Sequence, residues 1–448
     1  MLKSIGARNI EQLYQEIPDK LKLKTLLNLP PPFLAEMDLK KHVESILARN
    51  KTCSEYLNFL GAGCWQHYVP AVCDEITQRS EFLTAYVGDT YSDLGKFQVW
   101  FEFASQMGEL VNMDVVAVPL YSWGVAAGMA IRMAARITGR NEVLLPQTIC
   151  PERLSSIRTL CQPESMNSHI AIKKISYDLQ TGFINIDDVK TKISSQTAAV
   201  YVEIPSYLGF IEQNGSEIAK IAHESGALFI VGVDPISLGV LAPPADYGAD
   251  IVVGTAQTLG VHMNCGGGTI GFIASRDEER FVAEYPTFLV SITETEVDGE
   301  YGFGQCSFER TSYIARDKGK DWIGTAAGLW TVAATVYMAL MGPHGFKEIG
   351  NLIIQRSQYA MRLLSEIEGI KIPFSSANFK EFVVNFDNTG KTVEQINSKL
   401  LEHKIFGGKD ITKEFPELGN SALYCVTEVH NQKDIKRLAQ TIKEVLFS

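Results

Sequence analysis

The chain has 448 residues, of which 46% are hydrophobic and 21% are charged, and its formal net charge at pH 7 is −11. This length suffices for one large domain and a smaller one, and the composition is that of an ordinary globular protein. The negative charge, and the lack of any run of Lys or Arg, argue against a nucleic-acid-binding protein. The N-terminus lacks the apolar core of a signal peptide, and no stretch approaches the roughly 20 apolar residues of a membrane span. We therefore expect neither nucleic acid nor a membrane among the partners.

The eight cysteines are scattered along the chain without a C-x-x-C pair. This pattern predicts reduced, packed thiols and a cytoplasmic protein. Cys64 and His67 are close enough in the sequence to suggest a nucleophile or a metal pair. No further ligand cluster accompanies them, so no metal site is predicted.

The first part of the chain is predicted to be mostly helical. Residues 1–45 are expected to form an N-terminal arm, in which a helical stretch precedes an extended turn at the prolines 30–32. Residues 43–115 are also predicted to be mainly helical, with a polar connection around Gly88 to Gly95. A short apolar segment, 330–341, is predicted to be a buried helix.

Between residues 115 and 276, buried strands are predicted to alternate with helices. Ser122 precedes a helix at 125–137 that is apolar on nearly every side, as a buried helix is. Apolar strands are expected at 198–205 and 228–233, with an amphipathic helix between them. This is the βαβ order of a mostly parallel sheet.

Beyond about Gly342 the sequence predicts a small C-terminal α/β domain. Asn431 is expected to cap the last helix, whose apolar residues recur at helical spacing. The other expected elements are helices at 346–367 and 393–401 and strands at 370–373, 382–386 and 423–429. The expected domains are the arm 1–45, a large domain 46–340 and a small domain 341–448.

A carboxylate follows one central strand, and an amine is missing after the next. Asp234 follows strand 228–233, and Gln257-Thr258 follow strand 251–254. The layout resembles the large domain of fold-type I pyridoxal phosphate enzymes, in which a carboxylate holds the pyridine nitrogen protonated and a lysine forms the Schiff base. The chain has no lysine between Lys220 and Lys318, and a hydroxyl or amide cannot replace the amine. We expect a fold-type I transferase-like α/β fold without an internal aldimine.

The other residues of this predicted site have two interpretations each. Asp234 either binds a pyridinium or serves as a cap or salt-bridge partner, because a buried carboxylate without a partner is costly. Ser122 and Gly124 either bind the cofactor phosphate at a helix N-terminus or form a plain helix cap. The glycines 266–268 predict a tight turn before a strand at 269–273 rather than a phosphate site.

Three motifs resemble those of the glycine decarboxylase P-protein family. The first contains Gly61-Ala-Gly63, His67-Tyr68, Pro70, Arg79-Ser80-Glu81-Phe82 and Thr84-Ala85-Tyr86. The second runs from Val233 to Gly254, and the third from Ala333 to Gly345. The resemblance covers nearly the whole chain, whose length is similar to that of the α-type subunit of two-subunit forms, often called subunit 1.

The resemblance implies that a β-type partner subunit carries the Schiff-base lysine and the pyridoxal phosphate, in an α2β2 assembly with the active site at the α–β contact. It also implies that glycine loses CO2 there and that the aminomethyl group passes to the lipoyl arm of H-protein. This chain is then expected to be inactive alone and to complete its partner's site. The residues expected nearest the chemistry are His67, Tyr68, Arg79, Glu81 and Tyr86, whose polar and cationic groups suit the glycine carboxylate and the lipoyl disulfide.

Two tracts, 87–95 and 316–328, depart from the pattern of the family. Residues 87–95 replace the usual Thr-Pro-Tyr-Gln-Pro-Glu segment, and the second tract lacks the usual Arg-Glu-Lys-Ala-Thr-Ser-Asn run. Both are expected near the active site. Three interpretations follow: a working α subunit, a diverged relative whose complex handles another amino acid or carrier, and a non-catalytic structural or regulatory partner.

Overall fold

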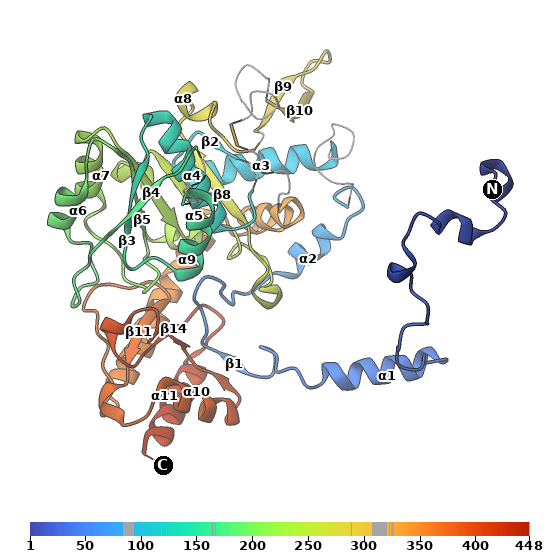
Figure 1. Cartoon of the computed structure of the whole chain (residues 1–448). Coiled ribbons are helices and arrows are strands. Elements are labelled where there is room, and N and C mark those ends of the chain that lie inside the picture. The colour runs from blue at the N-terminus through green and yellow to red at the C-terminus, as the bar shows by residue number, and fades with distance from the viewer. Residues whose placement is uncertain are drawn as a thin grey trace. The chain divides into compact units, whose positions relative to one another are not determined.

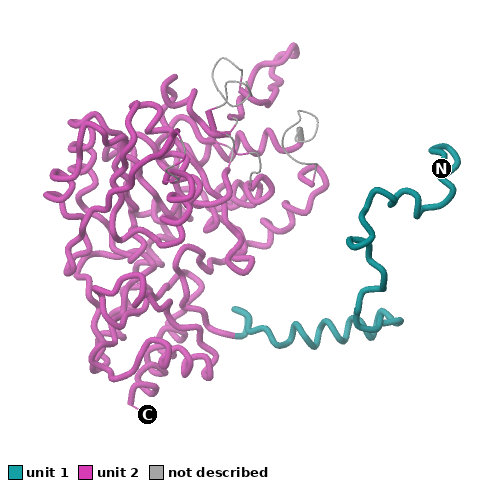
Figure 2. Tube along the Cα trace, in the orientation of Figure 1, with its two compact units in different colours: residues 1–55 teal, residues 56–448 magenta. Residues whose placement is uncertain are grey.

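The computed structural model describes residues 1–83, 94–117, 119–162, 165, 167–287, 289–306, 320, 321, 323 and 327–447. The chain divides into two compact units, residues 1–55 and 56–448, which Figure 2 draws in teal and magenta. No helix within these described ranges is long and apolar enough to cross a bilayer.

The first unit has no core of its own. It consists of the 3-10 helices Leu2–Ile5, Ile10–Tyr14 and Asp19–Leu21 and of helix α1 (Glu36–Leu47). The prolines 30–32 lie between the third 3-10 helix and α1, in a stretch without regular structure, as expected from their fixed backbone and missing N–H donors. None of its helices contains a buried residue, although the unit carries many large apolar side chains.

A seven-stranded sheet lies at the centre of the second unit (Figure 1). Its order is β2-β8-β7-β6-β5-β3-β4, in which β8 is antiparallel to both neighbours and the other pairs are parallel. The strands are β2 (Val115–Val116), β3 (Glu142–Pro146), β4 (Ala171–Ile175), β5 (Thr197–Glu203), β6 (Leu228–Val233), β7 (Ile251–Thr255) and β8 (Gly271–Ser275). Every residue of β5, β6 and β7 is buried, which is typical of parallel strands covered on both faces. The predicted, mostly parallel α/β sheet is confirmed.

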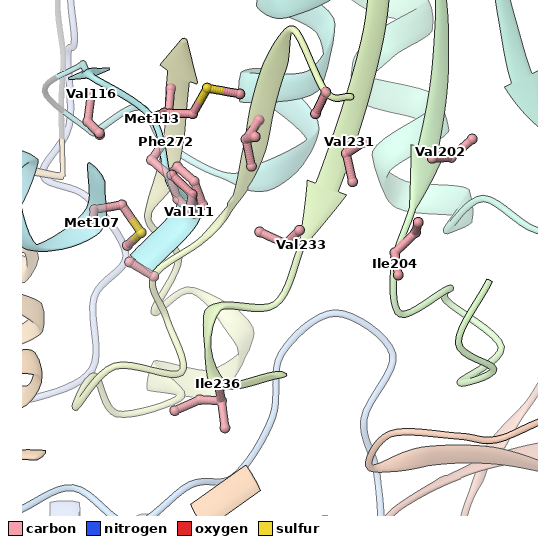
Figure 3. Close-up of a cluster of buried hydrophobic side chains, with 14 of the residues drawn as sticks. Met107, Val111, Met113, Val116, Val202, Ile204, Val231, Val233, Ile236 and Phe272 are labelled. Carbon is pink, nitrogen blue, oxygen red and sulfur yellow. The ribbon is translucent and has the colours of Figure 1, made fainter. Parts of the chain in front are cut away.

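Helices cover both faces of this sheet. Because successive strand residues point to opposite faces, Ile230 belongs to one apolar cluster and Val231 to the other. The helices of the first cluster include α4 (Trp123–Thr138) and α5 (Pro151–Cys161); those of the second include α3 (Leu94–Val111), α6 (Ile186–Lys192), α7 (Gly215–Glu224) and α9 (Gly328–Ser365). Figure 3 shows Val111, Val231 and Phe272 among the members of the second cluster.

The C-terminal part forms a smaller α/β layer. Its sheet has the antiparallel order β11-β14-β13 and packs against two helices and the end of α9. Its elements are β11 (Glu381–Asn385), α10 (Val393–Glu402), β12 (Ile405–Phe406), β13 (Lys409–Asp410), β14 (Ser421–Cys425) and α11 (Gln432–Phe447). The short strand β1 (Leu57–Asn58) pairs in parallel with β12, so the residues that follow the first unit are anchored to the C-terminal layer.

Several predicted elements differ from the observed ones. The helices expected at 330–341 and 346–367 form the single helix α9, interrupted at Gly342 with φ 55° and ψ −177°. The interruption precedes Pro343, which cannot donate to the helical ladder, and it lies at the expected boundary between the large and small domains, a boundary that stays a prediction. The strand expected at 370–373 is wrong, because only Lys371 forms an isolated bridge, to Asn385.

The region 43–115 is less helical than expected. Helix α2 (Ala71–Thr77) is short, and residues 48–70 contain no helix. Most of the predicted polar connection lies outside the described residues. A hairpin of β9 (Val290–Glu294) and β10 (Tyr301–Gln305) was not predicted.

Candidate functional site

Asp234 directly follows β6, at the carboxyl edge of the sheet, where open α/β sheets bind ligands. Its side chain is buried, and its Oδ1 accepts a hydrogen bond from the backbone N–H of Ile236 at 3.2 Å. Thr258, three residues beyond β7, donates its hydroxyl to the same Oδ1 at 3.1 Å. The hydroxyl that stands where the fold class has its lysine therefore bonds to the carboxylate that the fold class uses to hold the pyridinium.

The second carboxylate oxygen of Asp234 is paired with a lysine that the sequence did not single out. Lys380 Nζ lies 2.5 Å from Asp234 Oδ2, and the two side chains are only 2% and 5% exposed. Lys380 immediately precedes β11 and has φ 48°, a left-handed conformation that residues other than glycine rarely adopt. The backbone is held there by the N–H of Val426, which donates to the Lys380 carbonyl at 2.8 Å.

Two further groups surround the ammonium of Lys380. The ring centroid of Trp65 lies 3.4 Å from Nζ, a cation–π contact. His67 Nε2 lies 3.4 Å from the same Nζ. Asp234, Trp65 and His67 therefore form a cage of one carboxylate, one aromatic face and one imidazole around a buried primary ammonium.

His67 is held in turn by Glu428. Its Nδ1 lies 2.8 Å from Glu428 Oε2, and the N–H of Tyr68 donates to Oε1 at 2.7 Å. Burial by itself would raise the pKa of Glu428, but His67 and these hydrogen bonds outweigh burial and hold that pKa at about 2. Because a carboxylate can only accept, Nδ1 carries the proton, which leaves Nε2 as the acceptor for Lys380.

Gln257 fixes the segment that carries Trp65. The N–H of Trp65 donates to Gln257 Oε1 at 3.1 Å, and Gln257 Nε2 donates to the Trp65 carbonyl at 3.0 Å. Glu381 accepts a hydrogen bond from the N–H of Ala62 at 2.5 Å, and burial raises the pKa of this glutamate. Residues 62–68 are thus fastened by polar groups of both the sheet edge and the C-terminal layer.

A second buried ion pair is formed by Arg153 and Glu203, and Arg153 lines the same small cavity as Asp234 and Lys380. Arg153 Nε and Nη2 lie 2.7 and 2.9 Å from the two oxygens of Glu203, and the guanidinium stacks 4.0 Å from the ring of Trp123. Burial alone would lower the pKa of Arg153, but Glu203 outweighs burial and raises it. Tyr201 also donates its hydroxyl to Glu203 Oε1 at 3.0 Å, so this carboxylate has a further hydrogen-bond donor.

These side chains leave almost no free space beside Asp234. The cavity there measures about 10 Å³ and is lined by Trp65, Trp123, Arg153, Tyr207 and Lys380, among others. A single water needs roughly 10–15 Å³, and ligand pockets are typically several hundred. With Lys380 against Asp234 and no amine at position 258, these residues do not fit pyridoxal phosphate.

Ser122 and Gly124 take structural roles here. Ser122 is the N-cap of α4 and accepts a hydrogen bond from the N–H of Val125 at 3.3 Å. A Cβ on Gly124 would lie 2.8 Å from Ser156 Oγ and 3.2 Å from Arg153 Cα, so this glycine permits α4 and α5 to pack closely. A cavity of about 90 Å³ beside them is lined by charged groups of both signs, Glu152 and Arg153, and the guanidinium of Arg153 is already engaged by Glu203.

Three other predicted site residues, Tyr68, Arg79 and Glu81, lie at the surface. Tyr68 is 65% exposed, although its backbone is fixed by Glu428. Arg79 Nη2 and Glu81 Oε1 form an exposed ion pair of 2.6 Å just after α2, and Glu81 also lines a separate surface cavity of about 380 Å³. Tyr86 lies outside the described residues, as do most of the departing tracts. Among the predicted residues 67, 68, 79 and 81, which the structure describes, His67 alone contacts the Asp234 cluster, through Lys380.

The pair formed by Cys64 and His67 has no separate site. Burial raises the pKa of the Cys64 thiol to about 11, and both ring nitrogens of His67 face other partners. In the described part of the chain, no group of three or more His, Cys, Asp or Glu side chains is arranged to hold a metal ion.

Known proteins match the chain over its whole length. Residues 1–442 match the model of the family described as "Glycine cleavage system P-protein". Two curated relatives are each called "Probable glycine dehydrogenase (decarboxylating) subunit 1": the one from Staphylothermus marinus is 37% identical, covering 100% of this chain and 95% of that protein, and the one from Thermococcus onnurineus is 35% identical, covering 99% and 97%.

Solved structures agree with the fold. The crystal structure of an inhibitor-bound glycine decarboxylase P-protein matches with a TM-score of 0.86 at 31% identity, covering 99% of this chain and 97% of that one. A sphingosine-1-phosphate lyase from Burkholderia pseudomallei matches with a TM-score of 0.67 at 14% identity, covering 94% and 93%. The latter supports the fold alone, and the predicted fold-type I class is confirmed.

Proposed function

The chain belongs to the glycine cleavage system P-protein family, as its three motifs predicted, and on this premise we propose that it is the α-type subunit of a two-subunit glycine dehydrogenase (decarboxylating). Its relatives called subunit 1 match it almost end to end. The observation that carries the proposal is the Lys380–Asp234 pair, which fills the place of a cofactor in this chain. A chain of this family that has no room for the cofactor must act through another polypeptide.

The partner in this proposal is a β-type subunit that bears the Schiff-base lysine and the pyridoxal phosphate, in an α2β2 assembly. When bound there, the cofactor supplies the electron sink for decarboxylation. Glycine is the substrate, and the lipoyl arm of H-protein accepts the aminomethyl group.

Exposed residues of this chain are assigned to the partner's site. Tyr68 has a fixed backbone and an exposed side chain, so it presents its phenol from a rigid segment. Arg79 and Glu81 offer a cation and a carboxylate at the surface, and Tyr86 follows in the same motif. His67 is a positioning residue, because it acts through Glu428 and Lys380.

The first unit supports an assembly. Its 55 residues hold no buried side chain, yet they include exposed Leu26, Leu29 and Leu34 and many similar residues. Exposed apolar surface of this kind marks a protein–protein contact, and we propose that the partner subunit buries it. The eight free cysteines support a location in the reducing cytoplasm.

A second candidate is a diverged or non-catalytic partner subunit, which the departures at 87–95 and 316–328 favour. One experiment separates the candidates: exchange of labelled bicarbonate with glycine, measured with H-protein, for this chain, for the β subunit and for both together. The proposed function predicts exchange only by the two subunits together. A complex that contains the cofactor but gives no exchange would support the second candidate and contradict the first.

A further inference from the structure

The buried cage around Lys380 has the chemistry of an ammonium-binding site. It combines the carboxylate of Asp234 at 2.5 Å, the ring of Trp65 at 3.4 Å and the Nε2 acceptor of His67 at 3.4 Å. The carboxylate neutralises the ammonium charge as an ion pair, the ring contributes a cation–π contact, and the imidazole accepts a hydrogen bond. We propose that this pocket is an alkylammonium site whose resident ligand is the side chain of Lys380, which replaces the cofactor cation as the partner of Asp234.

The charge of the pocket requires a cation at this point. Asp234 is nearly fully buried, and its Oδ1 is already satisfied by neutral donors from Ile236 and Thr258. Its Oδ2 faces Lys380. The neighbouring cation Arg153 is engaged by both oxygens of Glu203 and is therefore committed elsewhere. Without Lys380, the Oδ2 charge of Asp234 would remain buried without a counter-ion, which is strongly unfavourable.

The ammonium also joins segments that are distant in the sequence. A chain of contacts runs from Glu428 through His67 and Lys380 to Asp234 and then to Thr258. It links the C-terminal layer, the segment that contains Trp65, and the ends of β6 and β7. In this arrangement the position that the cofactor has in the fold class is occupied by side chains that hold these segments together. All of these segments belong to the compact unit of residues 56–448.

The cage makes a specific prediction about a truncated lysine. Lys380→Ala removes Cγ, Cδ, Cε and Nζ, which are the atoms of propylammonium, and leaves the carboxylate, the ring and the imidazole in place. Propylammonium should then occupy the space and restore the lost stability, since a ligand that binds only the folded state stabilises it. The neutral analogue 1-propanol has nearly the same shape but no charge for Asp234.

The test measures the thermal midpoint of the full-length chain and of Lys380→Ala, with propylammonium chloride, with 1-propanol and with sodium chloride of equal ionic strength. Truncation should lower the midpoint by about 5 °C or more, and only propylammonium should raise it again, in proportion to the logarithm of its concentration. The matched control Lys399→Ala removes an exposed lysine that pairs with Glu402 at 3.0 Å and should not respond. Failure of propylammonium to act, or equal action by 1-propanol, would overturn the proposal.

A second pair of variants applies if Lys380→Ala does not fold. Lys380→Met keeps the stem but leaves Asp234 unpaired, and Asp234→Asn removes the charge but leaves the ammonium unpaired. The double variant should have a higher thermal midpoint than Lys380→Met alone, because neither charge remains. If the thermal midpoint of the double variant is lowered by as much as the two single variants together, or by more, the proposal is overturned. These measurements use this chain without a partner, so their outcome is independent of glycine turnover.

Discussion

Thr258 donates its hydroxyl to Asp234 at 3.1 Å, across the ends of two neighbouring parallel strands. In the fold-type I layout these are the places of the Schiff-base lysine and the pyridinium partner. Here they bond to one another, and Lys380 takes the remaining carboxylate oxygen. The loss of the amine is therefore accompanied by a rebuilt pocket, and restoring the amine alone should not restore a cofactor site.

Thr258→Lys tests this directly. A lysine at 258 would bring a second ammonium toward Asp234, in a space of about 10 Å³, so we expect no covalent cofactor and a free energy of unfolding lowered by about 1–3 kcal/mol through overpacking. The control Thr258→Val keeps the shape and loses one hydrogen bond, at a cost of about 1 kcal/mol. Visible absorbance after addition of pyridoxal phosphate and urea unfolding are the measurements. A borohydride-stable adduct on the introduced lysine would refute the rebuilt-pocket interpretation.

Arg153→Ala should destabilise the chain strongly. The substitution leaves Glu203 buried without its bidentate partner, which typically costs about 3–5 kcal/mol. The double variant Arg153→Met with Glu203→Gln removes both charges while keeping an acceptor for Tyr201. Its free energy of unfolding should fall by less than that of Arg153→Ala. Denaturant unfolding compares the two; equal losses would mean that packing rather than charge dominates at this position.

Glu428 should make the folded state sensitive to acid. Its pKa of about 2 lies below the ordinary value of 4.5, so its ionised form stabilises the fold above pH 4.5, and this contribution disappears as the pH falls toward 2. The full difference corresponds to about 3 kcal/mol. Unfolding measured from pH 7 to pH 3 should therefore be less pH-dependent in Glu428→Gln than in the unsubstituted chain. An identical pH dependence of the two proteins would contradict the assigned role of the His67–Glu428 pair.

Arg79→Ala separates a role in the partner's site from a role in folding. Arg79 is exposed and pairs with Glu81 at the surface, so the thermal midpoint of the chain should hardly change. Exchange by the two-subunit complex should fall by about tenfold or more if the guanidinium holds an anion there. Arg280→Ala is a matched control, because Arg280 forms a similar exposed pair with Glu278. Equal exchange by both variants would remove Arg79 from the site.

The sequence predicts features that depend on local pattern better than those that depend on distant contacts. The apolar runs of β5, β6 and β7 identify a buried parallel sheet, and Asp234 follows from its place after β6. Lys380 could not be found in this way, because it comes from a turn before a strand of the C-terminal layer. The pairing of His67 with Glu428 spans 361 positions, and no periodic pattern in the sequence predicts a contact over that distance.

The lysine did leave one signal in the sequence. A buried carboxylate without a partner is costly, so the place of Asp234 after a buried strand predicts a pyridinium, a cap or a salt-bridge partner for it. The sequence alone does not predict the topology that brings β11 to the carboxyl edge of the main sheet, and so it does not identify Lys380 as that partner. The hairpin of β9 and β10 was missed for a simpler reason, since its residues are partly exposed and carry no continuous apolar run.

The most direct test of the central claim is the location of the cofactor in the assembled two-subunit protein. The complex is reduced with borohydride, digested, and each pyridoxyl-modified peptide is identified and quantified by mass spectrometry. We expect one modified lysine for each pair of subunits, always in the partner, and none in this chain. A stoichiometric pyridoxyl group on any lysine of this chain, Lys380 included, would contradict it.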